Sequence, residues 1–351
     1  MVKFVQAWRK YNLGKWTLML LILFLFLLPV PQFIAPEAKL VTNSLLFSFT
    51  QMFMLIILAS DWNLIGGFTG YYDFGHAVFF GLGAYGTGVM MAQMGWAFMP
   101  ALLIGAVVAA IFAILLGSAT LRLRGAYFSI AMLGAFVAVR EIVRVLRPIT
   151  GGGSGLTLPP YLNRPLFYYV FLLFMIFVVA VIWWIRRSEF GYTLIAIRED
   201  EVGAEMRGIN TTLHKIVVFT LAATFTGLVG GLWAYQNTFI DPDVVFFDSR
   251  TLDMVLATLL GGLGTVSGPV LGAVLIYWLR DVLWVNFLQY HLIIQGLVLI
   301  LIVLFLPEGV LGSFDPNSGT RLGGWVGKIL READGETEEA ASAGESVEAT
   351  V

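Results

Sequence analysis

The stretch AFMPALLIGAVVAAIFAILLGSA, residues 97–119, contains no charged residue. A helix needs roughly 20 predominantly apolar residues to cross the hydrocarbon core of a bilayer, so this stretch is long enough to span it. Working outward from it, we predict spans at about 17–34, 40–60, 75–94, 97–119, 126–142, 166–185, 215–236, 251–266, 269–287 and 291–306. The sequence therefore predicts an all-α, polytopic membrane protein with about ten transmembrane helices.

The composition agrees with this class. Of the 351 residues, 58% are hydrophobic and 13% are charged, and the mean hydropathy is +0.84. Soluble domains carry about twice that charged fraction. The net charge of -2 gives no reason to expect a nucleic-acid partner, and the absence of cysteine excludes disulfides, thiolate metal sites and a cysteine nucleophile.

The distribution of basic residues predicts the orientation and the domains. All the charged side chains before Glu37 are basic, and Lys and Arg in short loops favour the cytoplasmic side. We therefore expect a cytoplasmic segment at 1–16, a membrane domain at 17–312 and a cytoplasmic tail at 313–351, acidic and disordered. We interpret 17–34 as a first span rather than a cleaved signal peptide.

Two glycine-rich segments interrupt apolar stretches, one in each half of the chain, and suggest an internal repeat of unknown orientation. Non-helical backbone at membrane depth is tolerated where it is buried in protein or lines a wet cavity, so the segments either line a transport path or allow close helix packing. His76 lies beside the first segment. We expect it to form hydrogen bonds with backbone carbonyls left free by the break, in preference to contacting a substrate. The candidate pathway residues are Gly66, Gly67, Gly70, His76, Gly261, Gly262 and Gly264.

The loop at 186–214 contains a predicted short helix at the membrane surface. Its first turn is acidic and ends with Glu201, its last turn holds Arg207, and Gly208 follows. These charges match the helix dipole, and glycine is typical just past a helix end. By itself the pattern also fits a solvated linker helix.

No motif for catalysis is present. The sequence lacks a G-x-x-x-x-G-K-[ST] loop, so it has no site of that kind for a nucleotide. His76, His214 and His291 are far apart in sequence, without paired metal-ligand spacing. We expect no enzyme activity, no metal and no cofactor in this chain.

An ordered set of short motifs resembles the LivM-type permeases of branched-chain amino acid ABC importers. The pattern Glu201-x-x-Ala204-x-x-x-Gly208-Ile209 resembles the coupling-loop signature of such permeases. The other matching motifs are Asn63-Leu64-x-Gly66-Gly67, Phe74-Gly75-His76-Ala77, Gly83-Ala84-Tyr85, Leu121-Arg122-Leu123-Arg124-Gly125-x-Tyr127, Thr150-Gly-Gly-Gly-Ser-Gly155, Arg187-Ser188-x-Phe190-Gly191, Ala196-Ile197-Arg198-Glu199-Asp200, Asp241-Pro242, Gly261-Gly-Leu-Gly264, Gly268-Pro269 and Leu306-Pro307-Glu308-Gly309.

The resemblance implies a permease subunit in a prokaryotic plasma membrane. It implies a LivH-type second permease, two cytoplasmic ATPases that bind ATP, and an external solute-binding protein. It also implies that the loop helix docks on an ATPase, with Glu201, Ala204, Glu205 and Gly208 as the docking residues.

One loop departs from the positive-inside pattern. Arg140, Arg144 and Arg147 fall on the external side, and their i, i+4, i+7 spacing places them on one face of a helix. They are candidates for docking acidic groups of the binding protein, and the alternative is pairing with lipid phosphates or with Glu141.

Other functions stay open at this point. A urea or short-chain amide importer would have a very similar permease, and an ATP-independent secondary transporter or channel would leave the loop helix without a role. A membrane-embedded enzyme would need a convergent catalytic cluster, which the sequence does not indicate.

Overall fold

The computed structural model describes residues 23–29, 42–161, 163–247 and 249–286, and isolated positions between 290 and 313. Residues 47–307 form one compact unit, which holds every site discussed below. In the other unit, formed by 1–46 and 308–351, the structure describes 23–29, the first residues of α4 and the short helix α17, Gly309–Ser313.

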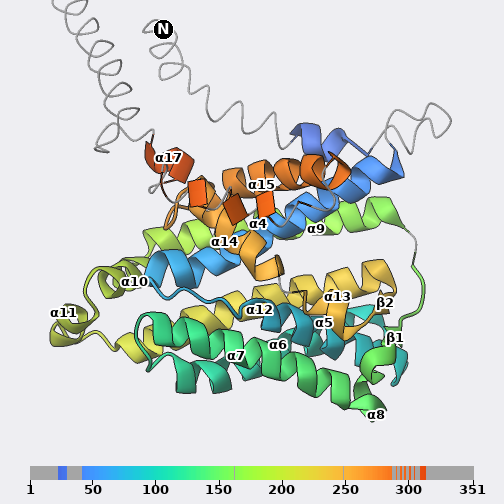
Figure 1. Cartoon of the computed structure of the whole chain (residues 1–351), viewed down its shortest axis with the longest axis horizontal. Coiled ribbons are helices and arrows are strands. Elements are labelled where there is room, and N and C mark those ends of the chain that lie inside the picture. The colour runs from blue at the N-terminus through green and yellow to red at the C-terminus, as the bar shows by residue number, and fades with distance from the viewer. Residues whose placement is uncertain are drawn as a thin grey trace, which may run out of the picture. The chain divides into compact units, whose positions relative to one another are not determined.

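Helices dominate the described residues (Figure 1). Their long apolar stretches form helices because every backbone N–H and C=O can then be satisfied within the same segment. The helices of the compact unit are α4 (Asn43–Thr69), α5 (Ala77–Ala92), α6 (Phe98–Thr120), α7 (Ala126–Val145), α8 (Arg147–Thr150), α9 (Arg164–Arg187), α10 (Glu189–Glu199), α11 (Glu201–Met206), α12 (Thr211–Asn237), α13 (Pro242–Val245), α14 (Ser249–Gly261) and α15 (Ser267–Asn286).

Five described helices are long and apolar enough to cross a membrane, namely α4, α6, α7, α9 and α12. A shorter apolar helix, α5, accompanies them. The fold class is therefore all-α and polytopic. Most of the predicted spans 17–34 and 291–306, the segment 1–16 and nearly all of the tail lie outside the described residues.

Glycine lets α5, α6 and α12 pack closely. A methyl group on Gly83 of α5 would overlap the carbonyl oxygen of Gly227 in α12, and one on Gly86 would lie 2.8 Å from the Cα of Gly105 in α6. Small residues are typical of membrane helix interfaces because contact between backbones there depends on close van der Waals packing. Here the small residues serve packing.

The first predicted interruption, in the glycine-rich stretch 66–70, occurs at the last glycine of that stretch. Gly66 and Gly67 are inside α4, which continues to Thr69, and the chain leaves the helix at Gly70, where φ is +77°. The helix continues because the two glycines leave space for the side chains of Trp62 and Asn63, one turn earlier. In the second segment α14 ends at Gly261 and α15 begins at Ser267.

Two ends of the compact unit are structurally distinct (Figure 1). At one end the short strands β1 (Leu156–Thr157) and β2 (Phe239–Ile240) pair antiparallel, with Leu156 opposite Ile240. At the other end lie α10 and α11. Helix α9 joins the two ends, and its 24 residues correspond to about 36 Å of helix.

Candidate functional site

The α10–α11 segment forms a helical hairpin between α9 and α12. The Ser188 hydroxyl caps α10 by accepting a hydrogen bond from the Gly191 N–H at 3.3 Å. Helix α11 begins at Glu201, and Gly208 follows it with φ at +85°, a conformation that glycine adopts without a steric penalty. Local sequence thus sets the start of α10 and the end of α11, the predicted loop helix.

A buried lysine fixes α11 to the membrane helices. Lys215, 2% exposed, donates hydrogen bonds to a Glu201 carboxylate oxygen at 2.6 Å, to the Tyr71 hydroxyl at 2.8 Å and to the Leu121 carbonyl at 3.0 Å. The Tyr71 hydroxyl donates to the other Glu201 oxygen at 2.6 Å. All three ammonium protons are therefore used, and four segments of the chain meet at one charge.

These contacts also set the ionisation of the carboxylate. Burial alone would raise the pKa of Glu201, but hydrogen bonds from Lys215 and Tyr71, and the charge of Lys215, outweigh it and lower the pKa below the ordinary value of 4.5. Glu201 is therefore charged at neutral pH and forms an ion pair with Lys215.

The two glycine-rich segments meet at one asparagine. The Asn63 side chain donates to the Thr265 carbonyl at 2.8 Å and accepts from the Gly264 N–H at 2.9 Å. Arg198 of α10 donates to the Gly67 carbonyl at 3.0 Å, and a methyl group on Gly264 would lie 2.5 Å from the Arg198 guanidinium. The α10–α11 segment therefore contacts both glycine-rich segments directly.

His76 lies in a buried polar chain. Its Nδ1 is 2.9 Å from the Asp73 carboxylate and its Nε2 is 3.0 Å from the Thr226 hydroxyl, which in turn is 3.4 Å from Asp61. The expected bonds from His76 to freed backbone carbonyls are replaced by bonds to side chains. His76 immediately precedes α5, which begins at Ala77, whereas the helix breaks earlier, at Gly70. The imidazole ring therefore bonds to Asp73 and Thr226.

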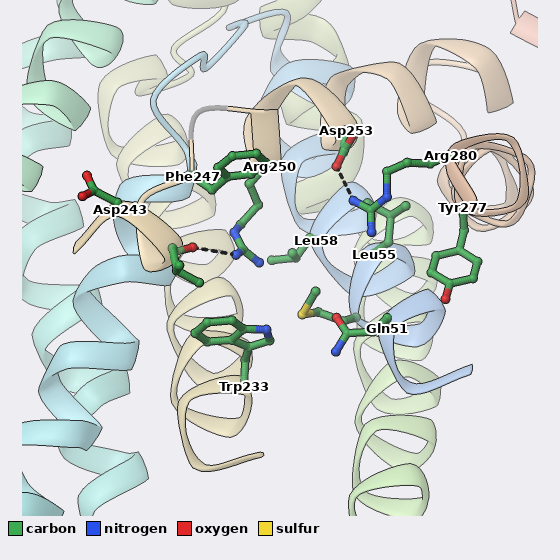
Figure 2. A pocket seen from close by; sticks show the side chains of 12 residues that line it. Gln51, Leu55, Leu58, Trp233, Asp243, Phe247, Arg250, Asp253, Tyr277 and Arg280 are labelled. Atoms are coloured by element: carbon green, nitrogen blue, oxygen red, sulfur yellow. Dashed lines mark hydrogen bonds and ion pairs between the residues drawn. The ribbon is translucent and has the colours of Figure 1, made fainter. Parts of the chain in front are cut away.

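A cavity of about 600 Å³ lies among α4, α12, α13, α14 and α15 (Figure 2). Its α4 wall is largely apolar and includes Met54, Leu55 and Leu58, whereas Arg250, Asp253 and Arg280 are charged. Arg280 donates to the Asp253 carboxylate at 2.8 Å. A cavity of this size with few polar groups is typical of a small-molecule site.

The four predicted docking residues lie in different environments. Ala204 is 3% exposed, and the Glu201 carboxylate is occupied by Lys215 and Tyr71. Glu205 and Gly208 are exposed, and the Thr211 hydroxyl donates to Glu205 at 2.7 Å. Val202 and Met206 also face outward and are 44% and 84% exposed.

The three predicted external arginines do not share one helix. Helix α7 ends at Val145, and Arg147 begins α8, where Pro148 follows, so the common-face spacing applies to Arg140 and Arg144 alone. Arg144 pairs with Asp243 and with Glu141, the latter at 3.1 Å. Pairing within the chain, one of the two alternatives, thus accounts for Arg144, while Arg147 stays exposed.

Sequence reasoning missed Arg250 and the role of Lys215. The signal for Lys215 was a lone lysine four residues into a long apolar helix, since an intramembrane cation needs a partner. Arg250 carries no local signal. Within the part of the chain that the structure describes, no group of three His, Asp or Glu side chains could hold a metal ion.

The features described are membrane-crossing helices packed through glycine, a cavity with a few charged groups, and a surface hairpin bound to both glycine-rich segments. Together they are typical of a multi-pass membrane permease. The chain belongs to the family of branched-chain amino acid transport system permease components, whose profile matches residues 44–303.

Curated relatives agree with this family. The chain is 28% identical over 299 residues to the high-affinity branched-chain amino acid transport system permease protein LivM of Salmonella typhimurium, covering 76% of this chain and 70% of the relative. It is 24% identical over 304 residues to the permease protein LivH of Escherichia coli, covering 77% of this chain and 97% of the relative. No solved structure matches the chain significantly.

Proposed function

We propose that this chain is a transmembrane permease subunit of an ABC importer for branched-chain amino acids. The support is the family, the LivM and LivH relatives and the α10–α11 hairpin. In this proposal the chain has about ten spans with both termini in the cytoplasm. It works with a LivH-type permease, two cytoplasmic ATPases that bind ATP, and an external solute-binding protein.

The observation that carries the proposal is the attachment of the hairpin to both glycine-rich segments. Movement of an ATPase against α11 would pass through Glu201 and Lys215 to α12, and through Arg198 to Gly67 and the loop that holds Gly264. Chains of packed side chains and hydrogen bonds can carry coupling between two sites, and these contacts support that role for the hairpin.

The exposed side of α11 is the docking surface in this proposal. Val202, Glu205 and Met206 lie at i, i+3 and i+4 and form one exposed face, and Gly208 ends the helix beside it. Glu201 and Ala204 hold the helix in position from the other side. Apolar groups exposed on a short surface helix are typical of a protein interface.

At the opposite end we propose that Arg147 contacts the binding protein. It is exposed, and α8 lies at the end of the helices opposite to α11 (Figure 1). Arg140 and Arg144 would contribute positive charge beside Glu141 and Asp243. Rim charges of this kind change the association rate and its salt dependence.

Purification of the tagged chain from native membranes tests the assembly. Two ATPases and a second permease are expected to accompany it, and the reconstituted complex is expected to take up leucine with ATP. Recovery of the chain alone in several detergents, together with uptake that needs no ATP, would refute the proposal.

Gly208 offers a sharper test through the pair Gly208→Val and Gly208→Asn. Space around Gly208 is open, so only its positive φ restricts the side chain. Asn tolerates this conformation and a β-branched residue does not. We expect the importer carrying Gly208→Val to keep hydrolysing ATP while its leucine uptake falls about tenfold, the factor that corresponds to a strain of about 1.4 kcal/mol at this residue. Gly208→Asn is the matched control, and normal uptake by Gly208→Val would contradict the coupling role.

A further inference from the structure

Arg250 is a charged residue in the wall of the cavity, and its contacts with the described residues leave part of its guanidinium group without a hydrogen-bond partner. It lies in the first turn of α14, and its guanidinium carbon is 3.9 Å from the centre of the Phe80 ring. The same carbon is 5.3 Å from the centre of the Trp233 ring (Figure 2). One Nη donates to the Val244 carbonyl at 3.3 Å. Its Nε is shielded from solvent and has no hydrogen-bond acceptor among the described residues.

The other charged groups in the wall are already paired. Arg280 bonds to Asp253, and Asp243 pairs with Arg144. Within the part of the chain that the structure describes, Arg250 forms no ion pair with a carboxylate. Aromatic rings hold its planar fork in place, and a fork with spare donors is complementary to a carboxylate, which it binds through two parallel hydrogen bonds.

The rest of the cavity fits an amphoteric molecule with a short apolar side chain. Met54, Leu55 and Leu58 offer an aliphatic wall on α4. A volume of about 600 Å³ accommodates a small ligand together with some water. Because α13 follows directly after β2, the cavity lies toward the end of the helices opposite to α11 (Figure 1).

We propose that the guanidinium of Arg250 binds the α-carboxylate of the transported amino acid, whose side chain lies against the apolar wall of α4. This inference rests on the proposed function and adds the binding group. Helix α14 runs from Arg250 to Gly261, and the loop after it contacts Asn63 and Arg198. Carboxylate binding at one end of α14 is thereby linked to the α10–α11 hairpin at the other.

The experiment uses the complete importer in proteoliposomes, with the variants Arg250→Gln and Arg250→Lys. The control is Arg164→Gln, since Arg164 also stacks on an aromatic ring, 5.4 Å from the centre of Phe47, away from the cavity. At saturating leucine we expect Arg250→Gln to lower the initial uptake rate at least about tenfold and Arg250→Lys to fall between it and the wild type, because a lysine keeps the charge and loses the fork. Arg164→Gln is expected to keep both leucine uptake and basal ATP hydrolysis near wild type.

A second measurement separates carboxylate binding from a structural role. Millimolar leucine is expected to protect the wild-type complex, freed of its binding protein, against thermal unfolding. Leucinamide, in which an amide replaces the carboxylate, is expected to protect less, and Arg250→Gln is expected to abolish the difference. If Arg250→Gln does not assemble, Arg250→Lys and the wild-type comparison of the two ligands decide the question.

The outcomes distinguish the two proposals. Equal protection by leucine and leucinamide, no protection by either, or wild-type uptake by Arg250→Gln would overturn the role of Arg250 and leave the importer function intact. A wild-type complex that hydrolyses ATP and does not take up leucine would overturn the proposed function itself.

Discussion

The ion pair between Glu201 and Lys215 gives a quantitative prediction about how the hairpin is held. The perturbations are Glu201→Gln, Lys215→Met and the double variant. Glu201→Gln keeps the shape of the side chain and leaves the Lys215 ammonium, 2% exposed, without a negative partner. Removing one partner of a buried ion pair costs about 3–5 kcal/mol, so we expect a loss of that size in the free energy of unfolding.

Lys215→Met is expected to cost less. Glu201 keeps the Tyr71 hydrogen bond and is 16% exposed, so water solvates its charge in part. The Leu121 carbonyl loses its donor from Lys215, and an unsatisfied buried acceptor costs about 1–3 kcal/mol. In the double variant no buried charge is left unpaired, so its loss is expected to be smaller than the sum of the single losses by about 0.5–3 kcal/mol.

The assay is equilibrium unfolding of the purified chain in mixed micelles, followed by tryptophan fluorescence. The control is Glu205→Gln, because Glu205 is exposed and accepts a hydrogen bond from the Thr211 hydroxyl, and we expect this variant to lose less than about 1 kcal/mol. Additive single losses, or a loss below about 1 kcal/mol for Glu201→Gln, would refute the reasoning, because Lys215 would then not depend on Glu201 as its partner.

Two further predictions use the same assay. The pKa of Glu201 is lowered in the folded state, so its contribution to stability is complete above the ordinary value of 4.5 and is lost as the pH falls through the lower folded value. The difference in unfolding free energy between wild type and Glu201→Gln should therefore decrease below pH 4.5. A difference that stays constant with pH would contradict the ion pair. Gly83→Ala should destabilise the chain by about 1–3 kcal/mol or more, because the added methyl group overlaps the Gly227 carbonyl. Its control, Gly134→Ala, has open space and should be neutral or stabilising by about 0.5–1 kcal/mol, and equal losses in the two variants would rule out the packing argument.

Much of the hairpin could be predicted from sequence because its signals are local. The acidic start at Glu201 and the glycine at 208 indicate a short helix, and the structure has α11 at Glu201–Met206. Which side of that helix faces outward was not predictable. Ala204 is buried and Met206 exposed because α11 packs against segments distant in sequence, and a helix of six residues has too little apolar periodicity to reveal this.

The exact position of the first break, at Gly70 and not at Gly66 or Gly67, was not predictable for a related reason. Glycine lowers helix propensity, but tertiary packing overrides this preference where a neighbouring group occupies the space that a side chain would need. Here the space beside Gly67 is occupied by the Asn63 amide, one turn earlier, and by the backbone of Gly264, which is about 200 positions away in the sequence. Likewise, the shared face of Arg140, Arg144 and Arg147 assumed one continuous helix, which ends at Val145.

The sequence by itself determined that the chain is helical and crosses a membrane, because apolar length and the need to satisfy backbone hydrogen bonds in lipid act locally along the chain. The tertiary structure alone decided which polar groups meet. Lys215 finds Glu201 and Tyr71, Asn63 joins the two glycine-rich segments, and Arg250 points into a cavity formed with α4, α12 and α15. These arrangements depend on side chains from separate helices coming within hydrogen-bond distance, and no local pattern specifies that distance.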